Sequence, residues 1–403
     1  MLPENRADPY PIYAFVRERE PVHQAVDGTW VLTGYDHASQ VLRDPRFSTN
    51  PKWLADDTRR ANDSLVRQAG TSLMMFLDPP DHDRLRSLVS QAFTPRMVEG
   101  MRPRVQRLVD DLLDAVAAAG HGRMDVLADL AYPLPAMVIC DLLGVPAADR
   151  DQFKAWASDA SRLLDGYLDT ESRMAGMVAG MHLFQYFNDL VDERRRQPHD
   201  DLLSALIAVE EDGERLTQAE LLSTVTLLFV AGFETTMNLV GNGMLALLRN
   251  RDQLDRLRHD PALLRPGIEE LLRYDSPVHV TARIPRVDVE VGGHRIEAGH
   301  EVAVVIGAAN RDPSQFPEPD RLDVSRTPNR HLAFGGGPHY CLGASLARLE
   351  GQIAFGTILR RFHHLELLTT EPRYRDHFVI RGVTALDVAF SAEAGSAPAP
   401  QPA

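Results

Sequence analysis

The chain has 403 residues, of which 44% are hydrophobic and 25% are charged, and its formal net charge is −14. This composition is that of an ordinary soluble globular protein, and the negative charge argues against nucleic acid or an anionic membrane as a partner. The two cysteines, Cys140 and Cys341, are too few for a disulfide framework, and residues 1–20 contain neither a signal peptide nor a membrane anchor. We therefore expect a cytoplasmic protein with one mainly helical domain over residues 1–391 and a disordered Ala/Pro-rich tail over residues 392–403.

The N-terminal part predicts a hairpin, a short helix, an irregular segment and a second helix. The hairpin covers residues 21–33 around an Asp-Gly turn, and the short helix covers residues 37–43. Residues 48–75 are polar and irregular, and a long loop in a compact fold is often functional. After two prolines, His82 and Arg86 lie four residues apart on one helical face, where a cationic pair suits a carboxylate ligand. A solvated basic face is the alternative.

Residues 95–196 contain several amphipathic helical segments, among them residues 105–113 and 131–143. Residues 174–187 combine methionines with aromatic residues. Side chains of this kind usually pack in a protein core, and we expect residues 174–187 to do so. An adaptable binding surface is the alternative, because methionine side chains are flexible.

The longest predicted helix begins at a capping box formed by Thr217 and Glu220 and runs to about Arg249. At about 1.5 Å per residue it spans roughly 50 Å. Its purely apolar stretch is short and stops at Glu234, so the helix does not have the pattern of a membrane span.

The middle of this helix carries residues that could take part in binding or proton transfer. Ala231 and Gly232 have minimal side chains, so a bulky group can lie against the helix. Glu234 is a carboxylate among apolar residues, which is costly unless it is paired, hydrated or protonated. Thr235 can donate its hydroxyl to a carbonyl one turn earlier and open the helix locally. These features fit a groove beside a proton relay, and a simple threonine kink in a core helix is the alternative.

The following segment predicts an ion pair and several strands. Glu270 and Arg273 lie on one helical face between apolar neighbours, which favours a partly buried pair. Strands are expected at residues 287–291, 294–296 and 302–306, strand-like segments at 378–380 and 386–388, and a helix from behind Cys341 to about Arg361.

The loop that ends at Cys341 reads Phe-Gly-Gly-Gly-Pro-His-Tyr-Cys-Leu-Gly over residues 334–343. A thiolate at a helix N-terminus is favoured by the unpaired N–H groups there, so we expect the pKa of this cysteine to be lowered. The glycines allow a tight turn and the close approach of a flat group, Phe334 offers an aromatic face, and His339 offers a donor. The alternative is a loop–helix junction with a buried, inert cysteine.

This loop resembles the haem-binding loop of the cytochrome P450 family, whose pattern Phe-Gly-x-Gly-x-His-x-Cys-x-Gly is met at every fixed position. Residues 231–235 are similar to the family's Ala/Gly-Gly-x-Asp/Glu-Thr motif, and the resemblance extends over nearly the whole chain. It implies a mainly α-helical P450 fold with small β-sheets and haem b between the long helix and the Cys341 loop.

The resemblance also implies roles for single residues. Cys341 would be the thiolate ligand of the iron, and Glu234 and Thr235 would deliver protons during oxygen activation. The haem propionates would be held by His82, Arg86, Arg283 and His339. The haem would also contact Ala231, Gly232, Phe334, Gly335 and Gly343. Glu270 and Arg273 would form a structural network with Arg321. The substrate wall would include Phe76, Phe229, Val278, Val280 and Val379, whereas His279 is expected to be an exposed loop residue.

The activity implied by the resemblance is insertion of one oxygen atom from O2 into a C–H bond or alkene of a mostly apolar small molecule, such as a polyketide, macrolide, terpenoid or steroid. Electrons would come from a ferredoxin and its reductase, which suggests a docking patch on the cysteine side with Arg96, Arg102, Arg104 and Arg348. We expect a monomer. A peroxide-using peroxygenase and a non-catalytic haem-thiolate sensor are the alternatives.

Overall fold

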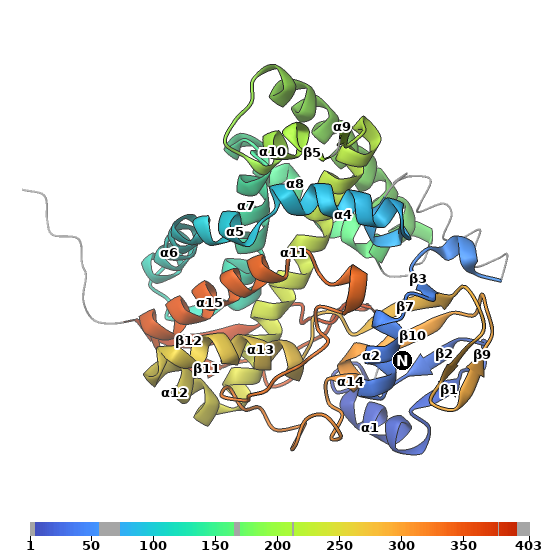
Figure 1. The fold of residues 1–403 in the computed structure, drawn as a ribbon. Coiled ribbons are helices and arrows are strands. Elements are labelled where there is room, and N and C mark those ends of the chain that lie inside the picture. Colours follow the sequence, from blue (N-terminus) through green and yellow to red (C-terminus); the bar gives the residue numbers. More distant parts are fainter. Residues whose placement is uncertain (1–4, 56–72, 165–169, 212, 378, 393–403) are drawn as a thin grey trace, which may run out of the picture.

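The computed structural model describes residues 5–55, 73–164, 170–211, 213–377 and 379–392. Helices dominate one side of the molecule and the larger sheet lies on the other (Figure 1). The helices are α1 (Tyr10–Arg19), α2 (Tyr35–Arg43), α4 (Asp81–Ala92), α5 (Pro95–Gly100), α6 (Arg102–Ala118), α7 (Pro133–Leu142), α8 (Arg150–Ser161), α9 (Thr170–Arg196), α10 (Leu202–Ala208), α11 (Gln218–Arg249), α12 (Arg251–His259), α13 (Leu264–Tyr274), α14 (Ile306–Ala309) and α15 (Ala344–Arg361).

The strands form two main sheets and two separate hairpins. They are β1 (Val22–Gln24), β2 (Trp30–Leu32), β3 (Phe47–Ser48), β4 (Arg123–Asp125), β5 (Glu210–Glu211), β6 (Glu214–Arg215), β7 (Val280–Pro285), β8 (Val289–Val291), β9 (His294–Ile296), β10 (Val302–Val305), β11 (Phe362–Leu367) and β12 (Asp387–Ala392). The larger sheet has the order β1-β2-β10-β7-β3, and the smaller has the order β11-β12-β4. Strand β10 runs parallel to β2 and antiparallel to β7, with Val302 opposite Arg283. This register fixes the position of Arg283 along strand β7.

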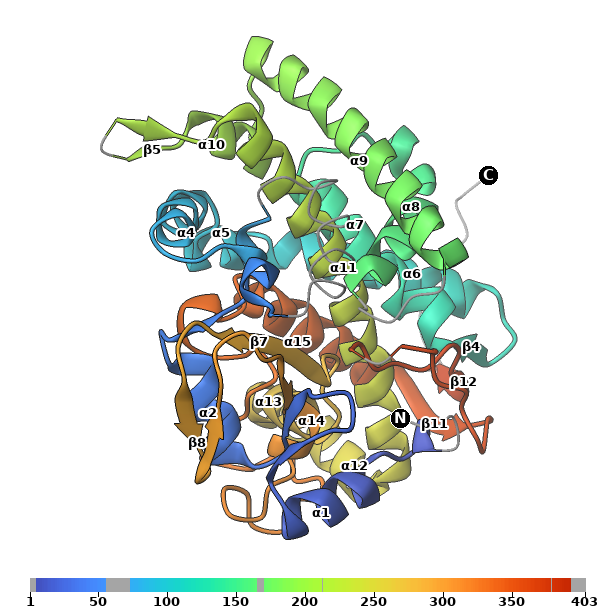
Figure 2. The same ribbon diagram turned by 90° about the vertical axis from the view of Figure 1, so that its right-hand side faces the viewer.

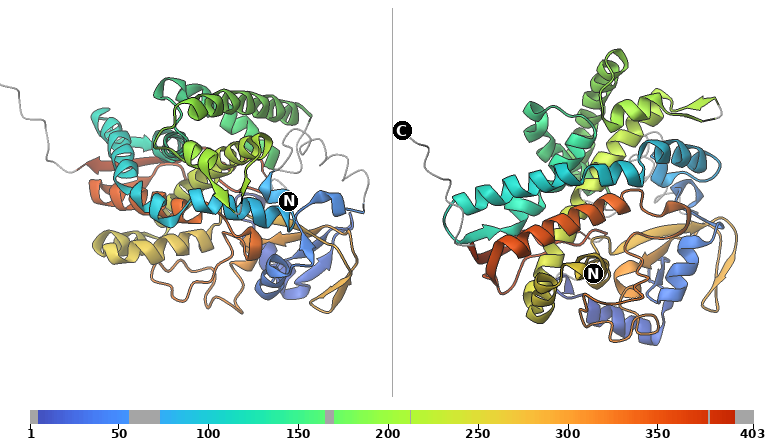
Figure 3. Two further views of the ribbon diagram at one scale, coloured as in Figure 1. Left: turned by 45° about the horizontal axis from the view of Figure 1, so that its top comes forward. Right: turned by 60° about the vertical axis from the view of Figure 1, so that its left-hand side comes forward.

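Helix α11 passes through the middle of the helical region and packs against α7, α8, α9, α13 and α15 (Figures 1 and 2). Helices α6 and α15 lie side by side, and α11 crosses them (Figure 3). The crossing with α15 is close because Gly243 has no side chain: a Cβ there would lie 2.7 Å from the ring of Phe355. Helix α11 is long and apolar enough to cross a membrane by length and composition. However, 67% of its most apolar window is buried inside the protein, as in a core helix.

Many of the elements predicted from sequence are confirmed. The hairpin β1–β2, helices α2 and α15, and strands β8, β9 and β10 form where they were expected. The capping box of α11 is present: Thr217 Oγ1 accepts from the Glu220 N–H, and Glu220 accepts from the Thr217 N–H. Strand β11 was not anticipated. Most of the segment at 48–75 and of the tail at 392–403 lies outside the described residues, as does Phe378.

The expectation that residues 174–187 pack in the core is only half right. Leu183 and Phe187 are buried, but Met174 and Met181 are 57% and 61% exposed. Helix α9 therefore buries one face against α8 and α11 and presents its methionine face to solvent.

Candidate active site

The Cys341 loop is held by its glycines and by the backbone of helix α2. Gly335 and Gly337 have positive φ angles of 71° and 67°, which glycine adopts without strain. A Cβ at Gly337 would lie 2.5 Å from the Leu42 carbonyl oxygen, so no larger residue fits at this contact. The Cys341 N–H donates to the Phe334 carbonyl over 2.9 Å, and α15 begins three residues later at Ala344. The loop thus presents the cysteine in front of a helix N-terminus, as predicted.

Cys341 is an exposed residue, whereas Cys140 is buried. Burial nevertheless raises the pKa of Cys341, and this effect outweighs the backbone N–H groups of Gly343 and Ala344 and the nearby Arg86 and Arg348, which act in the opposite direction. The prediction of a lowered pKa is therefore wrong for the protein alone, because crowding by protein atoms outweighs the helix terminus. Coordination of a cation would reverse this balance, since a coordinating thiol is deprotonated.

One face of helix α11 remains accessible although most of the helix is buried. Partial exposure at the i, i+3, i+4, i+7 spacing of one helical face is kept by Leu228, Ala231, Gly232 and Thr235. A Cβ at Gly232 would meet only Ile139 Cδ1, at 3.9 Å, so there is space beside the helix at this turn. The Thr235 hydroxyl donates to the Ala231 carbonyl over 2.8 Å, which confirms the predicted bond to the preceding turn.

Glu234 lies behind this accessible face. Its side chain is 2% exposed, and neither carboxylate oxygen makes a hydrogen bond to a described residue. Arg375 provides its cationic neighbour, with Nη1 3.6 Å from Oε1. A buried carboxylate with so little compensation is costly and marks a functional position rather than a stabilising one.

Four cationic or titratable side chains gather at the cysteine loop, His82 and Arg86 from α4, Arg283 from β7 and His339 from the loop itself. The rings of His82 and His339 lie 4.2 Å apart, and Arg86 Nη2 donates to the Tyr340 carbonyl over 2.8 Å. Burial lowers the pKa of His339 to about 3, helped by the positive charges of His82, Arg283 and Arg86. Burial alone lowers the pKa of Arg283 to about 10.

Among the described residues, Arg283 donates only to neutral groups, the Ala282 carbonyl at 2.8 Å and Thr281 Oγ1 at 3.2 Å. Within this group the one acidic partner found in the described residues is Asp83, 2.9 Å from His82 Nδ1, and Asp83 is itself 65% exposed. The buried positive charge is therefore not balanced from within the protein, which favours an anionic ligand at this position.

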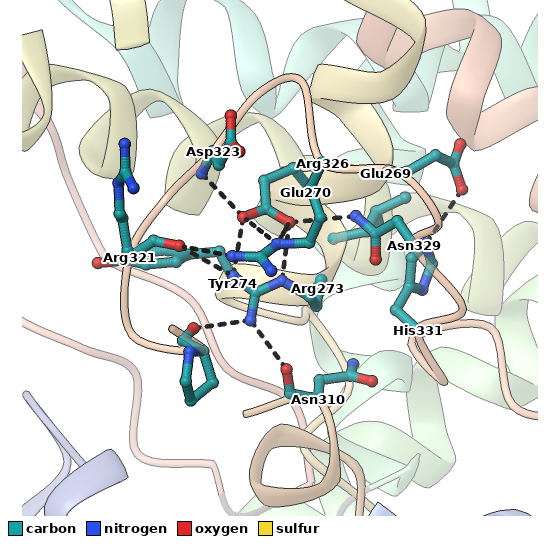
Figure 4. Close-up of polar contacts among 12 residues, drawn as sticks. Glu269, Glu270, Arg273, Tyr274, Asn310, Arg321, Asp323, Arg326, Asn329 and His331 are labelled. Carbon is teal, nitrogen blue, oxygen red and sulfur yellow. Dashed lines mark hydrogen bonds and ion pairs between the residues drawn. The ribbon is translucent and has the colours of Figure 1, made fainter. Parts of the chain in front are cut away.

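Glu270 and Arg273 are confirmed as the centre of a buried network (Figure 4). Both side chains are fully buried and are joined by two hydrogen bonds of 2.7 and 2.8 Å. The third arginine was predicted wrongly. Arg326, not Arg321, contacts the carboxylate, with Nε 3.2 Å from both oxygens. The Arg321 side chain is 60% exposed and pairs with Glu318, and only its backbone carbonyl accepts from Arg273.

The neighbouring Glu269 connects helix α13 to the cysteine loop. Burial alone would raise its pKa, but hydrogen bonds from His331 and Arg348 hold the pKa at about 2. The Arg348 guanidinium also lies 4.5 Å from the centre of the Phe334 ring. The predicted arginine docking patch is consequently weaker than expected, since Arg348 pairs with Glu269, Arg102 with Glu99 and Arg104 with Asp141.

The predicted substrate wall is only partly compatible with the structure. Val278 and Val379 are partly exposed and adjacent, because the His279 N–H donates to the Val379 carbonyl over 2.8 Å; Phe76, in the turn Met74–Phe76, is also partly exposed. These three residues remain predictions. Phe229 does not fit: it has no exposed surface and packs 5.1 Å from Phe153 between helices.

Two residues near strand β7 also differ from expectation. Val280 is buried in a small cluster with Tyr13, Val305 and Ala308, so it does not line a substrate wall. His279 is not an exposed loop residue but is 3% exposed, with Nδ1 3.2 Å from the Tyr13 hydroxyl. Burial lowers the pKa of His279. Strand β7 begins at Val280, and helix α1 covers His279 with Tyr10 and Tyr13.

Comparison with known proteins agrees with this geometry. The sequence model of the family Cytochrome P450 matches residues 22–385. Cytochrome P450 monooxygenase PikC of Streptomyces venezuelae is 45% identical over 390 residues, covering 95% of this chain and 91% of that protein. Vitamin D(3) 25-hydroxylase of Pseudonocardia autotrophica is 41% identical over 388 residues, covering 94% and 93% of the two chains. The crystal structure of P450BioI in complex with hexadec-9Z-enoic acid ligated acyl carrier protein matches with a TM-score of 0.89 at 39% identity, covering 96% of this chain and 99% of that one.

The chain belongs to the cytochrome P450 family. Its mainly helical fold with small sheets is the P450 fold, as predicted, and it is an enzyme of the P450 monooxygenase class. Membership implies a haem cofactor, O2 as a substrate and redox partners.

The residues present fit a haem. Cys341 is an exposed residue whose thiolate would bind the haem iron, and Gly232 leaves space beside α11. Arg283 is a buried cation without an acidic partner among the described residues, and His82 and His339 lie close to it as hydrogen-bonding groups, so this cluster suits propionate carboxylates.

Proposed function

We propose that the chain is a haem b monooxygenase that inserts one atom of O2 into a C–H bond or an alkene of a mostly apolar small molecule. The net reaction for hydroxylation is RH + O2 + 2 e⁻ + 2 H⁺ → ROH + H2O. The observation that supports the proposal best is that the accessible face of α11 carries Thr235 with the buried Glu234 beside it, while Cys341 is exposed in front of a helix N-terminus.

In this proposal haem b, when bound, supplies a thiolate-ligated iron at which O2 is activated. The chain supplies the proton path. Thr235 carries a hydroxyl on the accessible face of α11 and can exchange its bond to the Ala231 carbonyl for one to oxygen. Glu234 replaces the proton that is consumed, and positioned proton transfer of this kind contributes typically 10²–10⁴-fold to a rate.

His82, Arg86, Arg283 and His339 would hold the two propionates. Of these four residues, Arg283 has the clearest physical reason to bind a propionate. It is buried, and within the described part of the chain it makes hydrogen bonds only to neutral groups. A bound carboxylate would supply the charge-assisted hydrogen bonds that this guanidinium otherwise lacks.

For the substrate we propose an apolar, multi-carbon molecule, bound near Phe76, Val278 and Val379. Two relatives support an apolar, multi-carbon substrate. One is named a vitamin D(3) 25-hydroxylase, and the structure of another, P450BioI, is a complex with an acyl carrier protein that carries hexadec-9Z-enoic acid. We further propose that this chain works as a cytoplasmic monomer with electrons from a ferredoxin and its reductase.

The first experiment is the carbon monoxide difference spectrum of the dithionite-reduced protein. A strongly red-shifted Soret band, typical of thiolate ligation, supports Cys341 as the ligand. Absence of bound haem would contradict the proposal.

The second experiment separates the proposal from its two alternatives. Consumption of NADPH with surrogate ferredoxin and reductase, coupled to an oxygenated product, is expected for a monooxygenase. A haem-thiolate sensor would consume no NADPH, and a peroxygenase would make product with peroxide but not with the ferredoxin system. The presence of both Glu234 and Thr235 favours the monooxygenase.

A further inference from the structure

A single arginine from the C-terminal part of the chain contacts the buried carboxylate of α11. Arg375 Nη1 lies 3.6 Å from Glu234 Oε1, and the two side chains are 24% and 2% exposed. This distance is that of an ion pair rather than a direct hydrogen bond, and it leaves both carboxylate oxygens unbonded to described residues. A water molecule can bridge such a separation. Arg375 therefore lies between Glu234 and solvent.

The segment that carries Arg375 is fixed to the same helix as Glu234. The Arg375 N–H donates to the Gly382 carbonyl over 2.9 Å, and a Cβ at Gly382 would lie 1.9 Å from Asn238 Oδ1, so only glycine permits this approach. Asn242 Nδ2 donates to the Arg381 carbonyl over 3.0 Å. Arg375 Nη2 itself lies 3.7 Å from Met237 Sδ. The guanidinium is thus held against Glu234 and Met237, which stand on either side of Thr235 in the sequence of α11.

We infer that Arg375 is a positioning residue for proton delivery, which orients the Glu234 carboxylate between solvent and Thr235. The inference rests on the proposed function. Arg375 does not carry the proton, because a guanidinium stays protonated in proteins. Each proton comes from bulk water, passes to Glu234 and is handed toward Thr235, which leaves Glu234 negatively charged. The partial exposure of Arg375 gives water a route to the carboxylate.

The test compares Arg375→Gln, Arg375→Lys and the matched control Arg373→Gln. Arg373 lies two residues earlier on the same segment and is exposed. In the holoenzyme with surrogate ferredoxin, reductase and a converted substrate, R375Q is expected to form about tenfold less product per NADPH and to release more hydrogen peroxide. R375K should stay within about twofold of the wild type, and R373Q should match it. The solvent deuterium isotope effect on product formation should increase in R375Q alone, which a merely structural role would not produce.

A thermal melting cycle tests the pair independently of turnover. R375Q leaves a buried carboxylate without its cation, so the melting temperature is expected to fall by about 2–4 °C. In an E234Q background, R375Q should have little effect on the melting temperature or on the amount of product formed per NADPH. Additive effects of E234Q and R375Q would overturn the inference, as would unchanged coupling in R375Q. A wild-type protein without haem or turnover would refute the proposed function itself, and the melting cycle would still report whether the two residues interact.

Discussion

Replacement of Arg326 is expected to destabilise the fold strongly, whereas the same replacement at Arg321 is not. Arg326 is 11% exposed and shares the fully buried Glu270 carboxylate with Arg273. Breaking a buried ion pair by removing one partner typically costs 3–5 kcal/mol. Because Arg273 still compensates Glu270 in this variant, we expect Arg326→Gln to lower the free energy of unfolding by about 2–3 kcal/mol. Arg321 is 60% exposed and pairs with an exposed Glu318, so Arg321→Gln should change it by less than about 0.5 kcal/mol.

The assay is urea unfolding of the two holoenzymes, followed by circular dichroism and by the Soret band. Glu270→Gln serves as the reference for loss of the shared carboxylate and should cost the full 3–5 kcal/mol, because Arg273 is then buried without a counter-charge. Equal losses of stability in R326Q and R321Q would refute the reasoning, since they would mean that the long-range contact with Glu270 does not contribute.

Three further predictions concern the active site and its support. Thr235→Ala should reduce product formed per NADPH by about 10²-fold or more and raise peroxide release, whereas Thr235→Ser, which keeps the hydroxyl, should retain most of the coupling; equal coupling in both would contradict the role. Cys341→Ser should lose the thiolate-type carbon monoxide band, and Cys140→Ser should keep it; persistence of the band in C341S would show that another residue is the ligand. Glu269 has a folded pKa of about 2, below its ordinary value of 4.5, so its contribution to stability is complete above pH 4.5 and is lost as the pH falls toward 2. In Glu269→Gln the free energy of unfolding should therefore depend less on pH in that range than in the wild type. An unchanged pH dependence would contradict the role given to Glu269.

The Cys341 loop and the centre of α11 could be predicted from sequence because their chemistry is local. In the Cys341 loop, ten consecutive residues contain the glycines, the cysteine and the approach to the helix terminus. In α11, one helical turn contains Gly232, Glu234 and Thr235. Short-range geometry therefore determines the relative positions of these groups. The capping box of α11 was predictable for the same reason.

Two incorrect substrate residues could have been avoided by stricter use of periodicity. With 3.6 residues per turn, Phe229 points well away from the helical face shared by Leu228, Ala231 and Thr235. Val280 and Arg283 are three residues apart on strand β7, and side chains separated by an odd number of residues point to opposite faces of a strand.

Other features were beyond sequence reasoning because they depend on contacts between distant segments. Arg321 and Arg326 both follow the same proline-containing turn, and only the path of the chain places Arg326 against Glu270. His279 is buried because α1 supplies Tyr10 and Tyr13, from the opposite end of the sequence. Arg375 reaches Glu234 only because a glycine allows its segment to dock on α11.

The unbalanced positive charge of the buried Arg283 has a practical consequence for production of this protein. A ligand that binds only the folded state stabilises it by mass action, and here the ligand would also neutralise buried charge. Cofactor supply during expression therefore becomes a determinant of folding yield. Cultures given a haem precursor are expected to yield more folded enzyme from the same amount of translated chain.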